Sequence, residues 1–296
     1  MHRASLLINL DSRQGKKAYT EVMRSCQARG IEITATHKMG KGVDLYSLVR
    51  SIKRTQPELL IVAAGDGTVS RVVGYMEESS IEIGIIPLGT TNNFARSLGI
   101  PFVIEEAVAL LTQCSAQKVD LGQVGQRNFA NVVGIGISAL VASNVTGAQK
   151  HRWGRLAYAF VGLKCLLQHK PFFVTVTDKD GELELHFETH QVIIANGRYH
   201  AGQAISADAR VDNHELIVFP IGGRGRINFI IQTVKFYIGP RKSARHASYL
   251  IARDIKIHTS TPQPSEVDGE HFDPTPLSFC VKGGAVQIRY KKRGFT

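Results

Sequence analysis

The sequence has few cysteines and no long apolar run. Its 296 residues include 4 Cys, none with the CxxC spacing of a zinc or redox site, which favours unpaired thiols in a reducing compartment. The apolar segment 156–167 is interrupted by Lys164 and is shorter than the roughly 18 residues that a membrane-spanning helix needs. The run Leu6–Leu10 is too short for a signal peptide. We therefore expect a cytoplasmic protein.

Acidic residues are scarce relative to basic ones. The chain has 25 Asp and Glu against 36 Lys and Arg, a formal net charge of +11, although its 43% hydrophobic content is ordinary and excludes a disordered chain. At about 150 residues per domain, the length predicts two domains. The surplus positive charge favours a polyanionic partner: a nucleic acid, an anionic membrane or a phosphorylated small molecule. Composition leaves these three open.

The order of predicted elements divides the chain into two parts. Strands and helices alternate in the first part, which predicts a parallel sheet that binds ligands at the carboxyl ends of its strands. The predicted strands there are Ser5–Asn9, Ile31–Thr36, Leu59–Ala64 and Ile81–Ile86, and the helices include Lys16–Arg29, Leu45–Thr55 and Glu105–Leu111. After about Asp120 the runs become short and strand-like, which predicts an antiparallel sandwich or barrel with helical segments at Arg155–Leu167 and Ile227–Tyr237.

A glycine-rich turn follows the predicted strand Leu59–Ala64. It reads Gly65-Asp66-Gly67-Thr68 and leads into a helical segment. A strand, a glycine turn and a helix start expose backbone N–H groups to an anion such as phosphate. Asp66 would repel a phosphate unless it binds Mg²⁺, orients a donor or accepts a proton. The alternative is that Asp-Gly is simply a common turn dipeptide.

A second turn of this kind follows the next predicted strand. Here Gly89 precedes Thr90 and Thr91, whose hydroxyl groups can reach a phosphate or a ribose, and Asn92 or Asn93 can cap the helix that follows. Two glycine-hydroxyl turns at adjacent strand ends favour a nucleotide cleft over two ordinary connecting loops.

The two turns carry a family resemblance. The segments AGDGTVSRVV and GIIPLGTTNNFARSLGIP resemble the nucleotide loops of the diacylglycerol kinase catalytic-domain family, which includes bacterial lipid kinases and sphingosine and ceramide kinases. FANVVGIGISALVA, WGRLAYAFVGL, VIIANGRYHAGQ and VDGEHF are similar to later segments of that family in the same order. The resemblance implies a Rossmann-like α/β nucleotide domain over residues 1–120 and a β-sandwich acceptor domain over residues 121–285, with the chain end, 286–296, returning to the first domain.

The resemblance also implies an activity. It suggests an ATP- and Mg²⁺-dependent kinase that transfers the γ-phosphoryl group to the hydroxyl of a membrane lipid such as diacylglycerol. The family pattern places at the nucleotide cleft Asn9, Thr36, Ala64, Gly65, Asp66, Gly67, Thr68, Gly89, Thr90 and Asn92. Val267-Asp268-Gly269-Glu270 predicts a hairpin that projects Glu270, and the family has its proton acceptor at the matching glutamate. Asp66 is the second candidate base.

This chain departs from the family pattern at several acidic positions. Arg71 stands where the family usually has glutamate, Asn93 replaces a common aspartate, and Ala64 replaces the first loop glycine. Asn213, followed by His214, stands at the position of an aspartate that helps the family to hold a structural magnesium ion. These losses leave open a protein that binds nucleotide and lipid with little turnover. NAD kinases share the GDG turn and a similar two-domain plan, but this sequence lacks their downstream adenine-ribose signature, whereas PLGTTNNFAR fits lipid kinases.

Basic clusters flank the apolar segments of the second part. They lie at Lys150–Arg152, Arg224 and Arg226, Arg241–Arg245, and Lys291–Arg293. Cations beside exposed apolar surface suit docking to the anionic inner face of a membrane, whereas the same segments could equally pack in the core. No RNP, KH or helix-turn-helix signature is present, so we expect no nucleic-acid partner. The sequence leaves a homodimer open.

Overall fold

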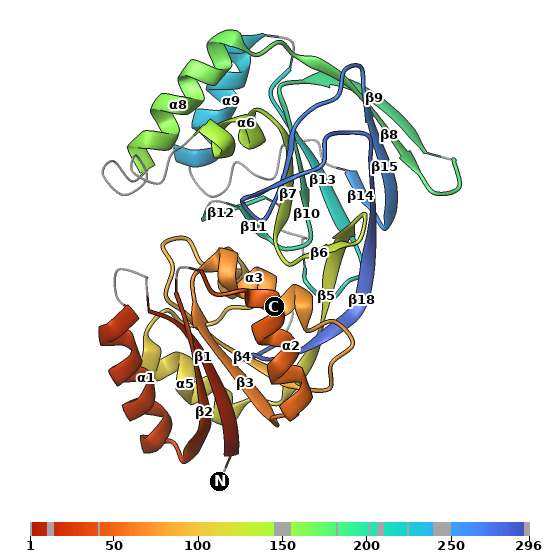
Figure 1. Ribbon diagram of the computed structural model, residues 1–296. Coiled ribbons are helices and arrows are strands. Elements are labelled where there is room, and N and C mark those ends of the chain that lie inside the picture. The colour runs from red at the N-terminus through yellow and green to blue at the C-terminus, as the bar shows by residue number, and fades with distance from the viewer. Residues whose placement is uncertain are drawn as a thin grey trace.

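The protein folds into two stacked parts joined by two long strands (Figure 1). The computed structural model describes residues 2–10, 15–40, 42–144, 155–181, 183–200, 202–205, 210–223, 225–238 and 250–292. The predicted basic clusters 150–152 and 241–245, together with Arg224 and Arg293, lie outside these residues. No helix in the described ranges is both long and apolar enough to cross a membrane.

The first part is a parallel sheet covered by helices. Its strands are β1 (His2–Asn9), β2 (Ile31–Met39), β3 (Leu59–Ala64) and β4 (Glu82–Pro87), in the order β2-β1-β3-β4. The helices are α1 (Gly15–Ala28), α2 (Leu45–Thr55), α3 (Asp66–Tyr75), α4 (Asn93–Ser97) and α5 (Ile104–Gln113). Every residue of β3 is buried, as expected for a central parallel strand. The predicted α/β class is confirmed.

The second part contains two facing antiparallel layers. One is a six-stranded sheet in the order β14-β13-β10-β7-β16-β17. Its strands are β7 (Val132–Gly136), β10 (Gln191–Ala195), β13 (Leu216–Ile221), β14 (Leu250–Ala252), β16 (Ser265–Val267) and β17 (Glu270–Phe272). The other layer has β5 (Ala116–Val124), β6 (Arg127–Phe129), β8 (Phe172–Asp178), β9 (Glu184–Thr189), β15 (Asp254–Thr259) and β18 (Leu277–Arg289). Phe172, Val192 and Ile257 lie in the buried core between them.

Three helices and a small ribbon complete this part. Helices α6 (Ile137–Asn144), α8 (Arg155–Gln168) and α9 (Arg226–Ile238) lie together on one side of it (Figure 1). Strands β11 (Tyr199–His200) and β12 (Gln203–Ala204) form a separate two-stranded ribbon close to α4. The predicted combination of a parallel α/β domain with an antiparallel β domain is confirmed.

Strand β18 joins the two parts into one continuous sheet. Near its start Phe279 pairs with Ile255 of β15, and near its end Ile288 pairs with Ile83 of β4. Strand β5 pairs with β18 on both sides of an irregularity between Lys282 and Val286. The predicted domain limit at residue 120 therefore falls within a strand that serves both parts. The relative position of the two parts is set by main-chain hydrogen bonds.

Candidate functional site

The two glycine-rich loops meet at the carboxyl ends of β3 and β4. Ala64 pairs with Pro87, and the Leu88 amide donates to the Ala64 carbonyl at 2.9 Å. A Cβ atom on Gly89 would lie 2.8 Å from Gly65 Cα, closer than side chains tolerate. Glycine at position 89 is thus required by the contact between the loops.

Asp66 begins α3 and links the first loop to the second. Its carboxylate accepts hydrogen bonds from Thr91 Oγ1 at 2.8 Å and from the Phe94 amide at 3.3 Å. Gly67 is exposed, and no atom lies within 4 Å of the position that a Cβ would occupy. Because the first N–H groups of a helix have no partner within the helix, this open space in front of α3 fits a phosphate group.

The second loop is held by Asn92. Its Oδ1 accepts from the Gly89 amide at 2.8 Å and its Nδ2 donates to the Gly89 carbonyl at 2.9 Å. Of the two residues predicted to cap α4, Asn92 occupies the N-cap position, but its side chain makes no cap hydrogen bond. The side-chain amide of Asn92 instead closes the loop through its two hydrogen bonds to Gly89. Asn93 accepts from the Gly202 amide at 2.8 Å, and Thr90 is exposed beside the loops.

Two other residues were predicted at the nucleotide cleft: Asn9 lies level with the loops, and Thr36 does not. Asn9 ends β1, one residue beyond the pairing of Ile8 with Ala63, and so lies level with Ala64 at the sheet edge. Thr36 pairs with Leu6, three residues before the end of β2. At about 3.3 Å per residue, this places Thr36 roughly 10 Å from the edge, away from the two loops.

Glu270 faces two arginines across the junction of the two parts. The prediction of a hairpin is confirmed: Asp268 (φ 51°) and Gly269 (φ 88°) form its turn, with the two positive φ angles of a type I′ turn. Glu270 Oε1 accepts from the Arg71 guanidinium at 3.1 Å, and Oε2 accepts from Arg127 at 2.7 Å. Arg71 belongs to α3, the helix that begins at the GDG loop. The predicted base, Glu270, therefore contacts this helix through the Arg71 side chain.

Asp268 was predicted only as a turn residue, yet its buried carboxylate anchors the hairpin. It accepts from the amides of Ala130, Asn131 and Val132 at 3.1, 3.2 and 3.0 Å, and from the Ser70 hydroxyl on α3. Burial raises the pKa of Asp268, while these hydrogen bonds act in the opposite direction. The carboxylate connects α3, the start of β7 and the hairpin that carries Glu270. Asp268 is therefore a positioning residue.

A second buried carboxyl group, Glu266, lies two residues earlier. Burial raises its pKa to about 7, with a further contribution from the charge of Asp268, while the nearby Ser138 hydroxyl acts in the opposite direction. Gly134 provides the space for this side chain, because a Cβ there would lie 2.9 Å from Glu266 Oε1. Glu266 thus faces β7 and α6, whereas Glu270 faces the two arginines.

A separate cavity of about 680 Å³ lies among α6, α8 and the segment 260–263. Leu140, Val161 and His169 line it, with Lys164 and Lys170 at its rim. Glu270 and the two glycine-rich loops are not part of its lining. The cavity is therefore distinct from the site described above.

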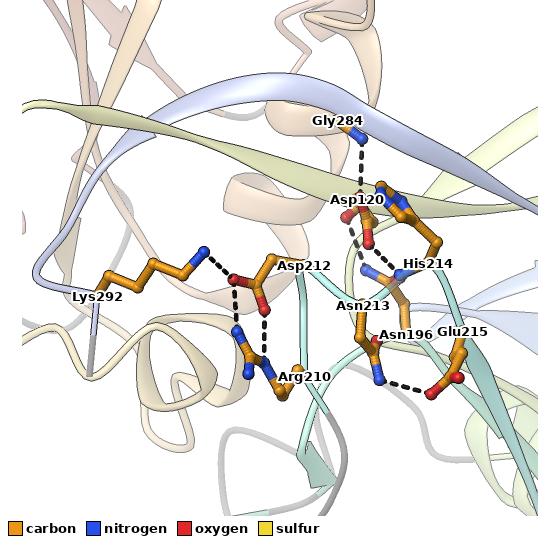
Figure 2. Close-up of polar contacts among 9 residues, drawn as sticks. All are labelled: Asp120, Asn196, Arg210, Asp212, Asn213, His214, Glu215, Gly284 and Lys292. Atoms are coloured by element: carbon orange, nitrogen blue, oxygen red, sulfur yellow. Dashed lines mark hydrogen bonds and ion pairs between the residues drawn. The ribbon is translucent and has the colours of Figure 1, made fainter. Parts of the chain in front are cut away.

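Near the predicted metal position, the carboxylate oxygens accept hydrogen bonds from donors of the protein itself (Figure 2). Asp120 Oδ1 accepts from the Gly284 amide at 2.7 Å and lies 3.0 Å from His214 Nδ1, and Oδ2 accepts from the His214 amide at 2.7 Å. Gly283 is needed beside this contact, because a Cβ there would lie 2.6 Å from His214 Nδ1. Asp120 thereby ties β5 to β18 and to the loop that precedes β13.

The neighbouring carboxylates of Asp212 and Glu215 also accept hydrogen bonds from protein side chains. Asp212 accepts from Arg210 and Lys292, each at 2.7 Å, and these cations, Arg210 foremost, lower its pKa to about 2. Asn213 donates to Glu215 at 2.7 Å, and its Oδ1 is buried without a partner. No cluster of three or more His, Cys, Asp or Glu suited to a metal ion occurs in the described ranges. One neutral amide oxygen does not make a magnesium site, so Asn213 and its neighbours do not fit the metal that the family resemblance implies.

Comparisons with known proteins agree with the predicted family. Residues 3–124 match the diacylglycerol kinase catalytic domain, and residues 131–290 match the YegS C-terminal NAD kinase beta sandwich-like domain. A diacylglycerol kinase of Bacillus subtilis (strain 168) is 26% identical over 284 residues, covering 94% of this chain and 93% of that protein.

Solved structures show the same fold. The crystal structure of a diacylglycerol kinase from Bacillus anthracis str. Sterne superposes with a TM-score of 0.76 at 23% identity, covering 98% of this chain and 97% of that one. A yeast NADH kinase complexed with NADH has a TM-score of 0.53 at 12% identity, covering 99% of this chain and 84% of its own. These two similarities concern fold alone.

Glu266 predicts a pH-dependent cost of burial. Folding raises the pKa of Glu266 from 4.5 to about 7, so the protein binds this proton more tightly when folded. The resulting contribution to the free energy of unfolding is fully present below pH 4.5 and is lost as the pH rises through 7. We expect Glu266→Gln to raise the free energy of unfolding more at pH 8 than at pH 5, by about 2 kcal/mol. Urea unfolding of both proteins at the two pH values measures this. An effect of equal size at both would contradict the assignment.

The Asp120 contacts predict stability that does not depend on a metal. Asp120→Ala removes a buried carboxylate that accepts from two backbone amides and should lower the free energy of unfolding by about 3 kcal/mol, whereas EDTA should leave the melting temperature unchanged. The exposed turn residue Asp180, changed to alanine, is the matched control and should have little effect. A fall in melting temperature with EDTA that Mg²⁺ reverses would show that a metal does bind here.

Proposed function

The chain belongs to the diacylglycerol kinase catalytic-domain family, a lipid kinase family, and we propose that it transfers the γ-phosphoryl group of ATP to the hydroxyl of a membrane lipid such as diacylglycerol. The observation that carries this proposal is the contact between Arg71 and Glu270. It brings a carboxylate from the second part of the chain to the helix that begins at the glycine-rich loop. A site for donor phosphates and a group that can accept a hydroxyl proton are therefore adjacent.

The proposed reaction uses these residues as follows. The first amides of α3, at Asp66 to Thr68, bind the donor phosphates, and the hydroxyl of Thr90 lies beside them. The acceptor hydroxyl gives its proton to Glu270 while its oxygen forms a bond to the γ-phosphorus and the bond to the β-phosphate oxygen breaks, which releases ADP. A divalent ion would neutralise charge on the donor phosphates, and Asp66 would be the carboxylate that holds it.

A second candidate function is binding of nucleotide and lipid without efficient turnover. It is favoured by the two ion pairs of Glu270, which engage both of its oxygens. An NAD kinase activity is supported only by the shared fold and the GDG turn. Nucleic-acid binding has the net charge alone in its favour.

The role of Glu270 as base can be tested by charge removal. We expect Glu270→Gln to lower kcat by about 10²- to 10⁴-fold with the Kd for ATP unchanged, because it removes the proton acceptor but not the phosphate site. Asp66→Asn should instead weaken ATP binding, because it alters the link between the two loops. Transfer of labelled γ-phosphate to lipid alcohols in mixed micelles and calorimetric ATP binding measure these two effects.

The matched control for this test is Glu184→Gln, an exposed carboxylate on β9. Full activity of Glu270→Gln would exclude Glu270 as the base. If the wild-type protein binds ATP but transfers phosphate to no lipid in the panel, the protein has the second candidate function.

Helix α9 is the proposed contact with an anionic membrane. Its exposed apolar side chains repeat at helical spacing: Ile227, Ile230, Ile231 and Val234 are 75%, 40%, 45% and 48% exposed, respectively. Phe229, between them in sequence, is buried and points to the protein. Arg226 and Lys235 add positive charge near the two ends of this stripe. An apolar stripe with nearby cations is typical of a helix that lies in the surface of an anionic bilayer.

A charge placed on this stripe should weaken membrane binding. We expect Ile231→Glu to reduce the partition coefficient for phosphatidylglycerol-containing vesicles by about 10- to 100-fold, because it removes buried apolar area and adds repulsion. Sedimentation with vesicles, with and without phosphatidylglycerol, measures this effect. Leu185→Glu on β9 is the control, an equally apolar and exposed position on another face. Unchanged binding of Ile231→Glu would remove α9 from the interface.

A further inference from the structure

A further cavity lies on the first part of the chain, in the groove between α2 and α3. Its volume is about 330 Å³, within the range of about 300–1,000 Å³ that is typical of small-molecule sites. Three cations and no carboxylate line it: the lining residues are Tyr46, Val49, Arg50, Lys53, Arg54 and Tyr75. Neither glycine-rich loop nor Glu270 belongs to this lining, so the cavity is separate from the candidate site.

Two contacts hold the walls of this cavity together. The rings of Tyr46 on α2 and Tyr75 on α3 meet edge to face, with their centres 5.3 Å apart. Lys53 Nζ donates to the carbonyl oxygens of Tyr75 and Glu77 at 3.3 and 3.1 Å, respectively. The end of α2 is thereby tied to the end of α3. The groove between the two helices is thus formed before any ligand binds.

Tyr46 presents an aromatic ring at this groove. Its side chain is 54% exposed, although an aromatic ring of this size is usually more deeply buried. Exposed aromatic rings beside cations bind nucleotide bases, because a base stacks on the ring and the cations bind its phosphates. Tyr46 therefore suits a ligand with a planar ring.

Arg50 and Arg54 are exposed cations without a partner of opposite charge. Within the part of the chain that the structure describes, neither makes an ion pair or a side-chain hydrogen bond. They lie four residues apart on α2, a spacing at which like charges repel each other. The helix dipole favours a cation in the last turn, where Arg54 lies, but gives Arg50 in the middle no such benefit. A bound anion would remove this repulsion.

The nearby carboxylates do not neutralise these arginines. None of four lines the cavity or forms an ion pair with its cations: Asp44, Glu58, Glu77 and Glu78. Asp44 accepts from the Tyr46 amide at the start of α2, and its charge acts on Arg71 of α3. Glu77 accepts from Asn128 at 2.6 Å. The positive charge at the groove is therefore available to a ligand.

We propose that this groove binds a free nucleotide, with its base against Tyr46 and its phosphate groups on Arg50 and Arg54. Guanidinium groups match phosphate oxygens in geometry and charge, and a small cavity beside an aromatic ring fits a molecule that carries both groups on one short framework. This site is additional to the donor site at the glycine-rich loops. It does not depend on the proposed lipid kinase activity.

The test places a fluorescent reporter at the groove. Tyr46→Trp keeps an aromatic ring there, and its emission is read as the difference from the wild-type protein, which has 1 Trp elsewhere. We expect ADP, which cannot donate a γ-phosphate, to quench this emission saturably. Adding Arg50→Gln or Arg54→Gln should weaken ADP binding by about 10-fold, as for the loss of one charge-assisted hydrogen bond. Adenosine and tripolyphosphate, which each provide half of the ligand, should both bind more weakly than ADP.

Two controls in the reporter protein separate this groove from other sites. Arg24→Gln changes an exposed arginine on α1 and should leave the affinity for ADP unchanged. Asp66→Asn alters the glycine-rich loops and should leave the quenching at the groove unchanged. Thermal unfolding shows that each variant is folded. If Asp66→Asn removes the quenching and the Arg50 and Arg54 variants do not, the signal comes from the donor site and the proposal is wrong.

Three other outcomes also overturn the proposal. The first is the absence of saturable quenching by ADP. The second is binding of tripolyphosphate as tight as that of ADP, which would make the groove a site for anions alone. The third is tighter binding of a short single-stranded oligonucleotide than of ADP at physiological salt, which would assign the groove to a nucleic acid. Each leaves the lipid kinase proposal standing, and failure of phosphate transfer to lipids leaves this binding site standing.

Discussion

The candidate site depends on a half-buried carboxylate, Asp268, that is held by neutral donors. Asp268 accepts hydrogen bonds from three consecutive amides at the start of β7 and from Ser70 of α3. Leaving a buried amide without an acceptor costs about 1–3 kcal/mol, and of these amides only that of Ala130 has a second acceptor among the printed contacts, the Ser70 hydroxyl. The hairpin can therefore pack against α3 in this position only with an acceptor at residue 268. Since Glu270 follows two residues later, its place beside Arg71 is set by the same hydrogen bonds.

The junction of the two parts uses the same principle at Asp120. Backbone amides of His214 and Gly284 and the His214 imidazole surround its oxygens, and the Arg210 and Lys292 side chains bind Asp212 nearby. These hydrogen bonds and ion pairs join the loops that carry the carboxylates, as a bound metal ion could. Part of the surplus of basic residues stabilises this junction. Net charge alone is consequently a poor guide to the protein's partners.

The sequence predicted the local elements well and the long-range pairs poorly. Leu45–Thr55 and Leu59–Ala64 match the structure because apolar spacing and nearby turn residues mark their ends. Strand β18 was predicted only near its end, because Gly283 and Gly284 interrupt its pattern, although pairing with β5 extends across them. Its return to the first part of the chain was expected from the family resemblance and not from any local pattern. The residues that pair between β18 and β4 are 205 positions apart, and such a pairing leaves no local signal.

The candidate site shows the same limit. The glycine-rich loops were found because phosphate binding at a helix start requires contiguous residues. Asp268 looked like a turn residue, since its amide partners lie 136–138 residues away in the sequence. Arg71 stood out as a reversal of charge, but its partner Glu270 is 199 residues away. Chemistry built from distant residues becomes visible only when the fold brings them together.

The strength of the Glu270 ion pairs bears on whether they block catalysis. The three side chains are 29–43% exposed, and ion pairs with this access to water are typically worth about 0.2–1 kcal/mol. A substrate that binds beside Glu270 can therefore displace the arginines at little cost and leave the Glu270 oxygens free to accept a proton. The ion pairs that favour the second candidate function are thus equally consistent with the resting state of an enzyme.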